Sequence, residues 1–162
     1  MLFGWLKPST ETPGSKVTYP YGKRDDFLSP AELSFCRVLK SELPAEWHLI
    51  AKVNLADLFF VRQPHRNQAA RNRIDRKHVD FVICGALTMK PLIGIELDDA
   101  SHDRKDRAER DAFVDQVFQA AGLPILHVTA ARGYQPAVLM EAIQKSLDLP
   151  GIAPENVPPA SH

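Results

Sequence analysis

The stretch that decides the fold reads GIELDDASH, Gly94–His102. It continues the apolar run PLI, and together they predict a buried strand over Leu92–Asp98 that ends among carboxylates. Side chains alternate along a strand, so Glu96 and Asp98 share one face, whereas Asp99 points away or lies in the turn. Two unit charges about 4 Å apart repel by roughly 4 kcal/mol at an effective dielectric of about 20, so these acids require compensation.

An aspartate interrupts the preceding apolar segment, KHVDFVICG, residues 77–85, which we predict to be another strand. One face of this strand carries the apolar residues Val79, Phe81 and Ile83, which we expect to pack on a helix. Asp80 lies on the other face and, if the two strands are neighbours, lies beside Glu96. A buried aspartate without a partner is costly, so Asp80 is a candidate member of the acidic group.

The segment SPAE, Ser29–Glu32, predicts the start of the first helix, with serine as N-cap, proline at the first helical position and glutamate three residues after the cap. Apolar residues follow at helical spacing, at Phe35, Cys36, Leu39 and Leu43. Glu32 lies on the same face as Phe35. It therefore either completes the capping box or points inward toward the acidic strands, and the sequence leaves both roles open.

The remaining segments complete an α/β pattern. We predict a strand at Trp47–Leu55, a helix at Arg104–Ala121, a buried strand at 124–129 and a last helix at Gln135–Leu147. Residues 56–73 are read as a basic, irregular loop. The order α-β-β-β-α-β-α implies a mixed central sheet flanked by helices on both faces.

Length and composition predict one folded domain, because 162 residues fit a single core and 44% of them are hydrophobic. We expect a flexible N-terminal arm at 1–26, a folded domain at 27–149 and a disordered Pro-rich tail at 150–162. Cys36 and Cys84 have neither disulfide nor metal spacing and are predicted to be small core residues. No segment is predicted to span a membrane, and a cytoplasmic location is expected. The oligomeric state is not encoded in any recognisable pattern.

Three kinds of compensation are open to the acidic group. The carboxylates can share a proton, which raises one pKa. They can pair with arginine or lysine, of which Arg104, Lys105 and Arg107 are close in sequence. They can also bind a hard divalent cation such as Mg²⁺, which uses one or two carboxylates together with water and substrate phosphate.

A basic run, VRQPHRNQAARNRIDRKH, precedes the strand that carries Asp80. Zero formal net charge means that any contact with nucleic acid depends on such a local patch. The candidate phosphate-binding residues are Arg62, Arg66, Arg71, Arg73, Arg76 and Lys77: such a run is usually a solvated loop, but beside a metal site for phosphodiesters phosphate binding is favoured. For Phe59 and Phe60 core packing is favoured over base stacking, and His127 is predicted to be a buried core histidine.

Glu32 on a first helix, Asp80 on a central strand and Glu96 on the next strand resemble the PD-(D/E)XK, or restriction-endonuclease-like, nuclease superfamily. The bacterial domain of unknown function 2726 family is similar over about 28–145, in the segments LSPAELSFCRVL, KVNLADL, NRIDRKHVDFVIC, IELDDASH, RDAFVDQVFQAAGLPILHV and the run into the last helix. IELDDASH also resembles the E-x-D-G-x-x-H segment of relatives of the very-short-patch-repair endonuclease.

The resemblance implies a site. Asp80 and Glu96 become ligands of Mg²⁺ or Mn²⁺, with the Leu97 carbonyl as a further ligand and Glu32 acting through water. Asp98 stands where the superfamily has lysine, and it becomes another metal ligand. His102 then acts as general acid or base. Alternatively, a cation takes the place of the lysine, with Lys77, Lys105 and Arg110 as candidates.

The function implied by the resemblance is a metal-dependent endonuclease that hydrolyses phosphodiester bonds in DNA, in repair, processing or mobile-element defence. The missing lysine supports an alternative, in which the chain is a catalytically inactive nucleic-acid-binding or adaptor module of the same fold.

Overall fold

The computed structural model describes residues 19–98 and 104–148. His102 and Asp99 lie outside the described residues, as do the predicted tail at 150–162 and residues 1–18 of the predicted N-terminal arm. No helix within the two described ranges is both long and apolar enough to cross a membrane.

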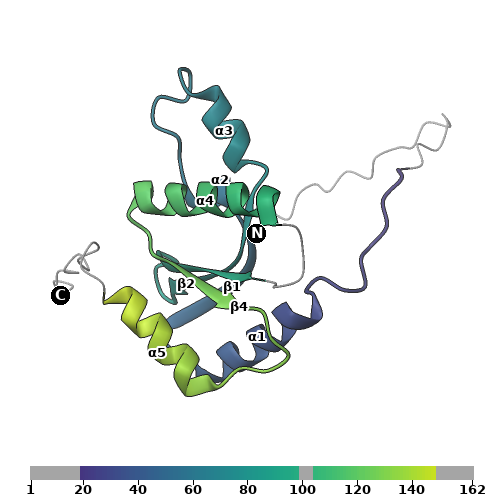
Figure 1. Ribbon diagram of the computed structural model, residues 1–162, viewed down its shortest axis with the longest axis vertical. Helices are drawn as coiled ribbons and strands as arrows, with labels where there is room; N and C mark the ends of the chain where they lie inside the picture. The colour runs from purple at the N-terminus through teal and green to yellow at the C-terminus, as the bar shows by residue number, and fades with distance from the viewer. Residues whose placement is uncertain (1–18, 99–103, 149–162) are drawn as a thin grey trace, which may run out of the picture.

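The centre of the molecule is a four-stranded mixed sheet in the order β1-β2-β3-β4 (Figure 1). Its strands are β1 (Trp47–Asn54), β2 (His78–Gly85), β3 (Pro91–Asp98) and β4 (Ile125–Thr129). The pairs β1–β2 and β2–β3 are antiparallel, and β3–β4 is parallel. A parallel pair needs a crossover, which is supplied by α4 (Arg104–Ala121). The predicted α/β class and mixed sheet are confirmed.

Helices cover both faces of this sheet. One face packs against α1 (Pro30–Glu42) and α5 (Pro136–Leu147), and the core there includes Phe35, Leu39, Phe81, Ile83, Ile95 and Ile143. The other face packs against α4 and two short helices, with a core that includes Leu55, Ile74, Val79, Val82, Val114 and Phe118. Cys36 and Cys84 are buried in these two cores, as predicted.

The predicted irregular loop at 56–73 is wrong in part, because two short helices lie there, α2 (Leu55–Leu58) and α3 (Gln68–Ile74). α2 begins where the Asn54 side chain caps the N–H of Ala56 at 2.8 Å and Leu55 enters the core. α3 is polar along almost its whole length, and Ile74 is its one buried residue. It therefore lacks the apolar period by which a helix is recognised in a sequence.

The predicted alternation on β2 holds for Phe81 and Ile83 but fails at Val79, which packs in the core of the α4 face. The irregularity lies where β1 passes this part of β2. There Ala51 pairs with Phe81 and Val53 with Val79, while Lys52 between them has a left-handed backbone, with φ of 57°. A local break in the ladder changes which way the following side chains point.

The seat of α4 on the sheet depends on Gly94 of β3. A Cβ at this position would lie 2.6 Å from Cζ of the buried Phe118 ring. Glycine therefore allows α4 to approach the strand that carries Glu96 and Asp98.

Candidate active site

The site begins where β2 and β3 stop pairing. Their ladder runs from Cys84 opposite Pro91 to Phe81 opposite Ile95. At the next position the Asp80 carboxylate accepts a hydrogen bond from the backbone N–H of Leu97, at 2.9 Å. In a regular ladder a backbone carbonyl would accept this hydrogen bond. Here the Asp80 carboxylate accepts it instead, so the charge of Asp80 lies between the ends of β2 and β3.

Glu96 is the second acid at this place. It is buried, and its side chain lies within hydrogen-bonding reach of Asp80. Burial raises the pKa of Asp80 above its ordinary value, and the negative charge of Glu32 adds to this, against the opposing effects of the Leu97 N–H, Glu96 and Lys52. A buried carboxylate such as Asp80, with a raised pKa and acidic neighbours, is stabilised by taking up a proton or by a nearby cation.

Glu32 fills both roles that the sequence left open. Its carboxylate accepts a hydrogen bond from the Ser29 N–H at 2.7 Å, which completes the capping box of α1. The same carboxylate, almost fully buried, also accepts a hydrogen bond from Nζ of Lys52. Burial alone would raise the pKa of Glu32, but the bonds from Lys52 and Ser29 outweigh it, and the pKa is lowered.

Lys52 was missed by the sequence reasoning, which named Lys77, Lys105 and Arg110 as replacements for the superfamily lysine. Lys77 is half-buried at the start of β2, and the side chains of Lys105 and Arg110 lie outside the described residues. Lys52 instead reaches the acids from β1. The signal that was available is a lysine within the apolar segment LIAKV of β1, where a charged side chain needs a partner.

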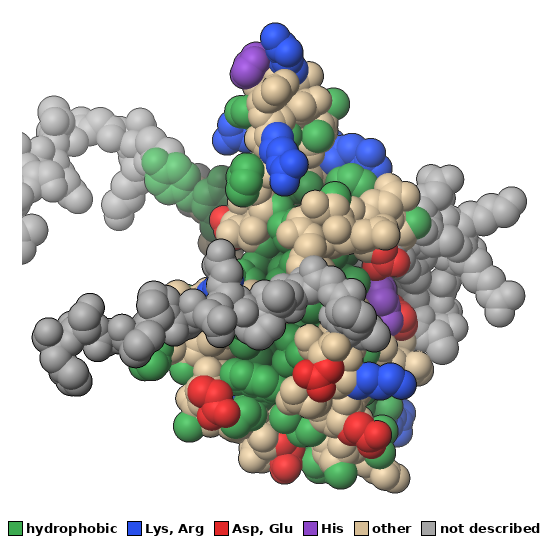
Figure 2. Space-filling model, turned by 90° about the vertical axis from the view of Figure 1, so that its left-hand side faces the viewer, with side chains coloured by type: hydrophobic (Ala, Val, Ile, Leu, Met, Phe, Trp, Pro, Cys, Tyr) green, Lys and Arg blue, Asp and Glu red, His purple; other side chains and the backbone are tan. Residues whose placement is uncertain are grey.

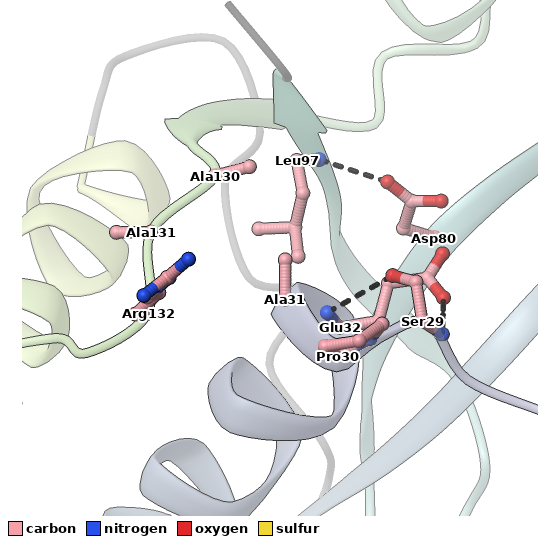
Figure 3. Close-up of a pocket in the computed structure, with 9 residues that line it drawn as sticks. All are labelled: Ser29, Pro30, Ala31, Glu32, Asp80, Leu97, Ala130, Ala131 and Arg132. Atoms are coloured by element: carbon pink, nitrogen blue, oxygen red, sulfur yellow. Dashed lines mark hydrogen bonds between the residues drawn. The ribbon is translucent and has the colours of Figure 1, made fainter.

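Of these residues, Glu32 and Asp80 line a cavity of about 820 Å³ (Figure 3). Its lining consists of Ser29, Pro30, Ala31, Glu32, Asp80, Leu97, Ala130, Ala131 and Arg132. Figure 3 shows Asp80 and Glu32 on one side and Arg132 on the other. The Arg132 carbonyl accepts a hydrogen bond from the Ser34 hydroxyl at 2.9 Å, which ties the loop after β4 to α1. Sequence reasoning did not single out Arg132.

Asp98 takes part in a different group of side chains. Its carboxylate lies 3.2 Å from Nδ1 of His127 on β4, and Nε2 of the same ring lies 2.9 Å from Asp115 on α4. Burial lowers the pKa of His127, but the two carboxylates outweigh this, and its pKa is raised. The prediction of a buried core histidine is wrong, because β4 is an edge strand and His127 is exposed.

The structure therefore brings Glu32, Asp80 and Glu96 together and turns Asp98 toward His127. Among the described residues, no three acidic, histidine or cysteine side chains are arranged to hold a metal ion by themselves. A metal at this place would depend on the Asp80 and Glu96 carboxylates, completed by a backbone carbonyl, water or substrate. Mg²⁺ commonly binds in this way.

The predicted phosphate-binding residues lie on one projecting element, residues 60–77, here called the basic protrusion. It carries α3 away from the sheet and beyond α4 (Figure 1), and Figure 2 shows Lys and Arg side chains around it. Its exposed cations are Arg62, Arg66, Arg71, Arg73 and Arg76, with Lys77 half-buried at its base. The Arg73 guanidinium stacks on the Phe113 ring of α4, 3.8 Å from the centroid.

The base of the basic protrusion is fixed to the end of β1. The Asn54 side-chain amide donates to the Asp75 carbonyl at 3.0 Å, and the Leu55 N–H donates to the Lys77 carbonyl at 2.9 Å. On β1 the bonded residues Asn54 and Leu55 follow Lys52 by two and three positions. On the other side of the contact, Lys77 precedes Asp80 of β2 by three positions. The cations and the acids thus belong to the same end of the sheet.

A family model described as a protein of unknown function, DUF2726, matches residues 24–147. The chain belongs to this family. The DUF2726 match runs from just before α1 to the end of α5, so it includes Glu32, Lys52, Asp80, Glu96 and the basic protrusion. Searches of curated proteins and of solved structures gave no significant match.

Proposed function

We propose that this DUF2726 protein is a Mg²⁺- or Mn²⁺-dependent nuclease that hydrolyses phosphodiester bonds in DNA. The proposal includes a restriction-endonuclease-like fold, a relation to very-short-patch-repair endonucleases and a cytoplasmic site of action. The observation that supports it most is the Asp80 carboxylate between the ends of β2 and β3, beside buried Glu96 and facing an open cavity.

The donor set suits a hard divalent cation. Asp80 and Glu96 supply carboxylate oxygens, and the pKa of Asp80 is raised chiefly by burial, with a further contribution from the negative charge of Glu32. The Leu97 carbonyl, one residue beyond Glu96, is a further oxygen donor in the same strand. In such a centre a bound Mg²⁺ or Mn²⁺ would polarise the scissile phosphate and activate a water molecule.

The protein's own cations would then hold the scissile phosphate. Lys52 supplies an ammonium beside the acids, and its bond to Glu32 fixes its direction. In this role it replaces the superfamily lysine whose place in the sequence Asp98 occupies. Arg132, across the cavity, is placed to bind a second phosphate oxygen. Glu32 is a positioning residue, because it acts through Lys52 and through the start of α1.

The basic protrusion would hold the DNA backbone next to this centre. Its arginines are exposed and lie on α3 and the loop before and after it. Contacts of this kind add salt-dependent affinity and no sequence specificity. We therefore propose a nuclease without sequence-specific readout by this element.

A second candidate is a catalytically inactive DNA-binding module, and one observation favours it. The third acid, Asp98, is bonded to His127, and the Lys52 ammonium is already engaged by Glu32. A centre with two carboxylates and an occupied lysine is poorer than the superfamily pattern. This candidate predicts salt-sensitive DNA binding without metal-dependent cleavage.

One experiment separates the two candidates. Supercoiled plasmid and labelled oligonucleotides are incubated with purified protein in Mn²⁺, in Mg²⁺ and in EDTA. The nuclease proposal predicts cleavage by the wild type in either metal, none by Asp80→Asn, and wild-type rates for Glu141→Gln, an exposed acid on α5 that serves as control. Binding by every variant with no cleavage by any of them would establish the inactive module instead.

A further inference from the structure

We propose that Phe60 and the basic protrusion bind a single-stranded stretch of nucleic acid, with the Phe60 ring stacked on a base. The inference rests on the nucleic-acid part of the proposed function and adds the form of the strand. It does not depend on cleavage.

The first observation is the different fate of two adjacent phenylalanines. Phe59 packs edge-on against Phe118, with 4.9 Å between ring centroids, as core packing predicts. Phe60, for which core packing was also favoured, is 84% exposed. Its side chain points away from the layer that Phe59 joins, because successive residues of an extended backbone face opposite ways.

The second observation is the positive charge of the segment that follows Phe60 in the sequence. The basic protrusion, which begins at Phe60, contains six basic residues and one acid, Asp75. An exposed apolar residue is ordinary on a protein surface. An exposed ring at the start of a strongly cationic element is the combination that binds single strands, because phosphates pair with the cations while a base stacks on the ring.

The third observation is how little holds α3 in place. It has seven residues, and Ile74 is its one buried side chain. Arg73 adds a stacking contact with Phe113. A helix of this length is marginal by itself in water, so a bound polyanion would contribute to its order. The protrusion thus has the properties of an element completed by an oppositely charged partner.

A single strand fits these features better than a duplex. Duplex bases are already stacked within the helix, so an isolated exposed ring gains nothing from them, and α3 at about 1.5 Å per residue is too short to follow the major groove. An acidic protein segment would satisfy the arginines but offers no flat partner for Phe60. Stacking therefore distinguishes a single strand from both alternatives.

The location connects this site to the acids. Lys77, at the end of the protrusion, is three residues before Asp80 along β2, or about 10 Å at the rise of a strand. α3 packs on the α4 face of the sheet and the cavity opens on the α1 face, so a strand held on the protrusion would pass the end of the sheet at Asp80 to reach the cavity. The proposed nuclease would then act at or near single-stranded segments.

The test measures binding in EDTA, where cleavage does not occur. Fluorescence anisotropy compares the full chain on a labelled oligo-dT of about twenty nucleotides and on a duplex of equal length. The variants are Phe60→Leu, which removes the ring, Phe60→Trp, which keeps a ring, and Leu87→Ala, a control at a fully exposed apolar residue in the turn between β2 and β3.

We expect tighter binding to oligo-dT than to the duplex, and a loss of about tenfold for Phe60→Leu on oligo-dT alone. Phe60→Trp and Leu87→Ala should bind like the wild type. Equal affinity for the two nucleic acids or unchanged affinity of Phe60→Leu would overturn the proposal. So would a competition in which polyglutamate displaces labelled oligo-dT as well as unlabelled oligo-dT does. If Phe60-dependent binding holds but Mn²⁺ produces no cleavage, the nuclease proposal fails and the single-strand site stands.

Discussion

Lys52 on β1 donates a hydrogen bond to the buried Glu32 carboxylate on α1 from a left-handed backbone, with φ of 57°. This conformation costs a residue with a Cβ about 1–2 kcal/mol. Strain of this kind persists where the surrounding structure requires it, and it is concentrated at functional sites. The strained residue also supplies the ammonium that bonds the buried Glu32 carboxylate, so we infer that the left-handed backbone at Lys52 serves to direct the ammonium toward the acids.

Lys52 and Glu32 should contribute to the free energy of unfolding as a coupled pair. Lys52→Met removes the partner of a buried carboxylate and should lower the free energy of unfolding by about 1–3 kcal/mol. Glu32→Gln in the same background should recover part of that loss, because no unpaired charge then remains. Chemical denaturation of the two single variants and the double variant gives the coupling energy, and additive effects would show that the contact contributes nothing.

The pH dependence of this pair has a defined sign. The pKa of Glu32 is lowered in the folded protein, so the stability it contributes is present above its ordinary value of 4.5 and is lost as the pH falls through the lowered pKa. The difference in unfolding free energy between wild type and Glu32→Gln should therefore shrink on acidification. A difference that grows below pH about 4.5 would contradict this.

Asp80 should show the opposite behaviour. Its pKa is raised above its ordinary value of 3.8 by burial, so its stabilising contribution is present below that value and is lost as the pH rises through the raised pKa. Asp80→Asn keeps an acceptor for the Leu97 N–H and removes the charge. We expect its Tm to exceed that of the wild type by a few degrees at neutral pH and to match it in acid.

Stabilisation by Asp80→Asn would fit the proposed catalytic role of Asp80, because functional residues are often retained at the expense of stability. Mn²⁺ should raise the Tm of the wild type and leave that of Asp80→Asn unchanged, because only the former binds the ion. A less stable Asp80→Asn at neutral pH would mean that the carboxylate is structural.

Much of the fold was predictable because local signals agreed with one another. The Ser29 capping box and the spacing of Phe35 and Leu39 marked α1, and the structure shows the helix beginning there. The apolar runs around Asp80 and Glu96 marked two adjacent strands. α3 was not predictable, because its order depends on Ile74 and on one stacking contact with α4, and neither leaves a periodic pattern.

The acidic part of the candidate site was predictable for the same reason, since Asp80 and Glu96 lie in consecutive strands, which the structure shows to be paired. Strand alternation placed Asp98 with Glu96, but it could not show that His127 on β4 would engage Asp98. Lys52 is linked to the acids through the pairing of β1 with β2 and through its own unusual φ. Both are tertiary properties that a single sequence does not display.

The packing of α4 on β3 is testable at Gly94. Gly94→Ala would bring Cβ into the buried Phe118 ring, so it should lower the free energy of unfolding by about 1–3 kcal/mol. Gly133→Ala is the matched control, because nothing lies within 4 Å of a Cβ there. Urea denaturation should show the loss for Gly94→Ala alone. The loss of unfolding free energy caused by Gly94→Ala should differ when Phe118→Leu is also present. Equal stability of the Gly94→Ala and Gly133→Ala variants would refute the close approach of α4 to β3.

The group of Asp98, His127 and Asp115 should stabilise the protein in its charged form. The pKa of His127 is raised, so its contribution is present below the ordinary value of 6.5 and is lost as the pH rises through the raised pKa. The residues are exposed, so His127→Gln should lower the Tm by only about 1–3 °C at pH about 6 and by less at pH about 9. A constant difference across this range would show that charge is not involved.

The central claim is that Asp80 and Glu96 form a divalent metal centre, and calorimetric titration of Mn²⁺ tests it most directly. The wild type and the Glu141→Gln control should bind the ion saturably at one site, and Asp80→Asn and Glu96→Ala should not. Equal binding by wild type and Asp80→Asn would place any metal elsewhere. No binding by the wild type, even with a non-cleavable oligonucleotide present, would contradict the account.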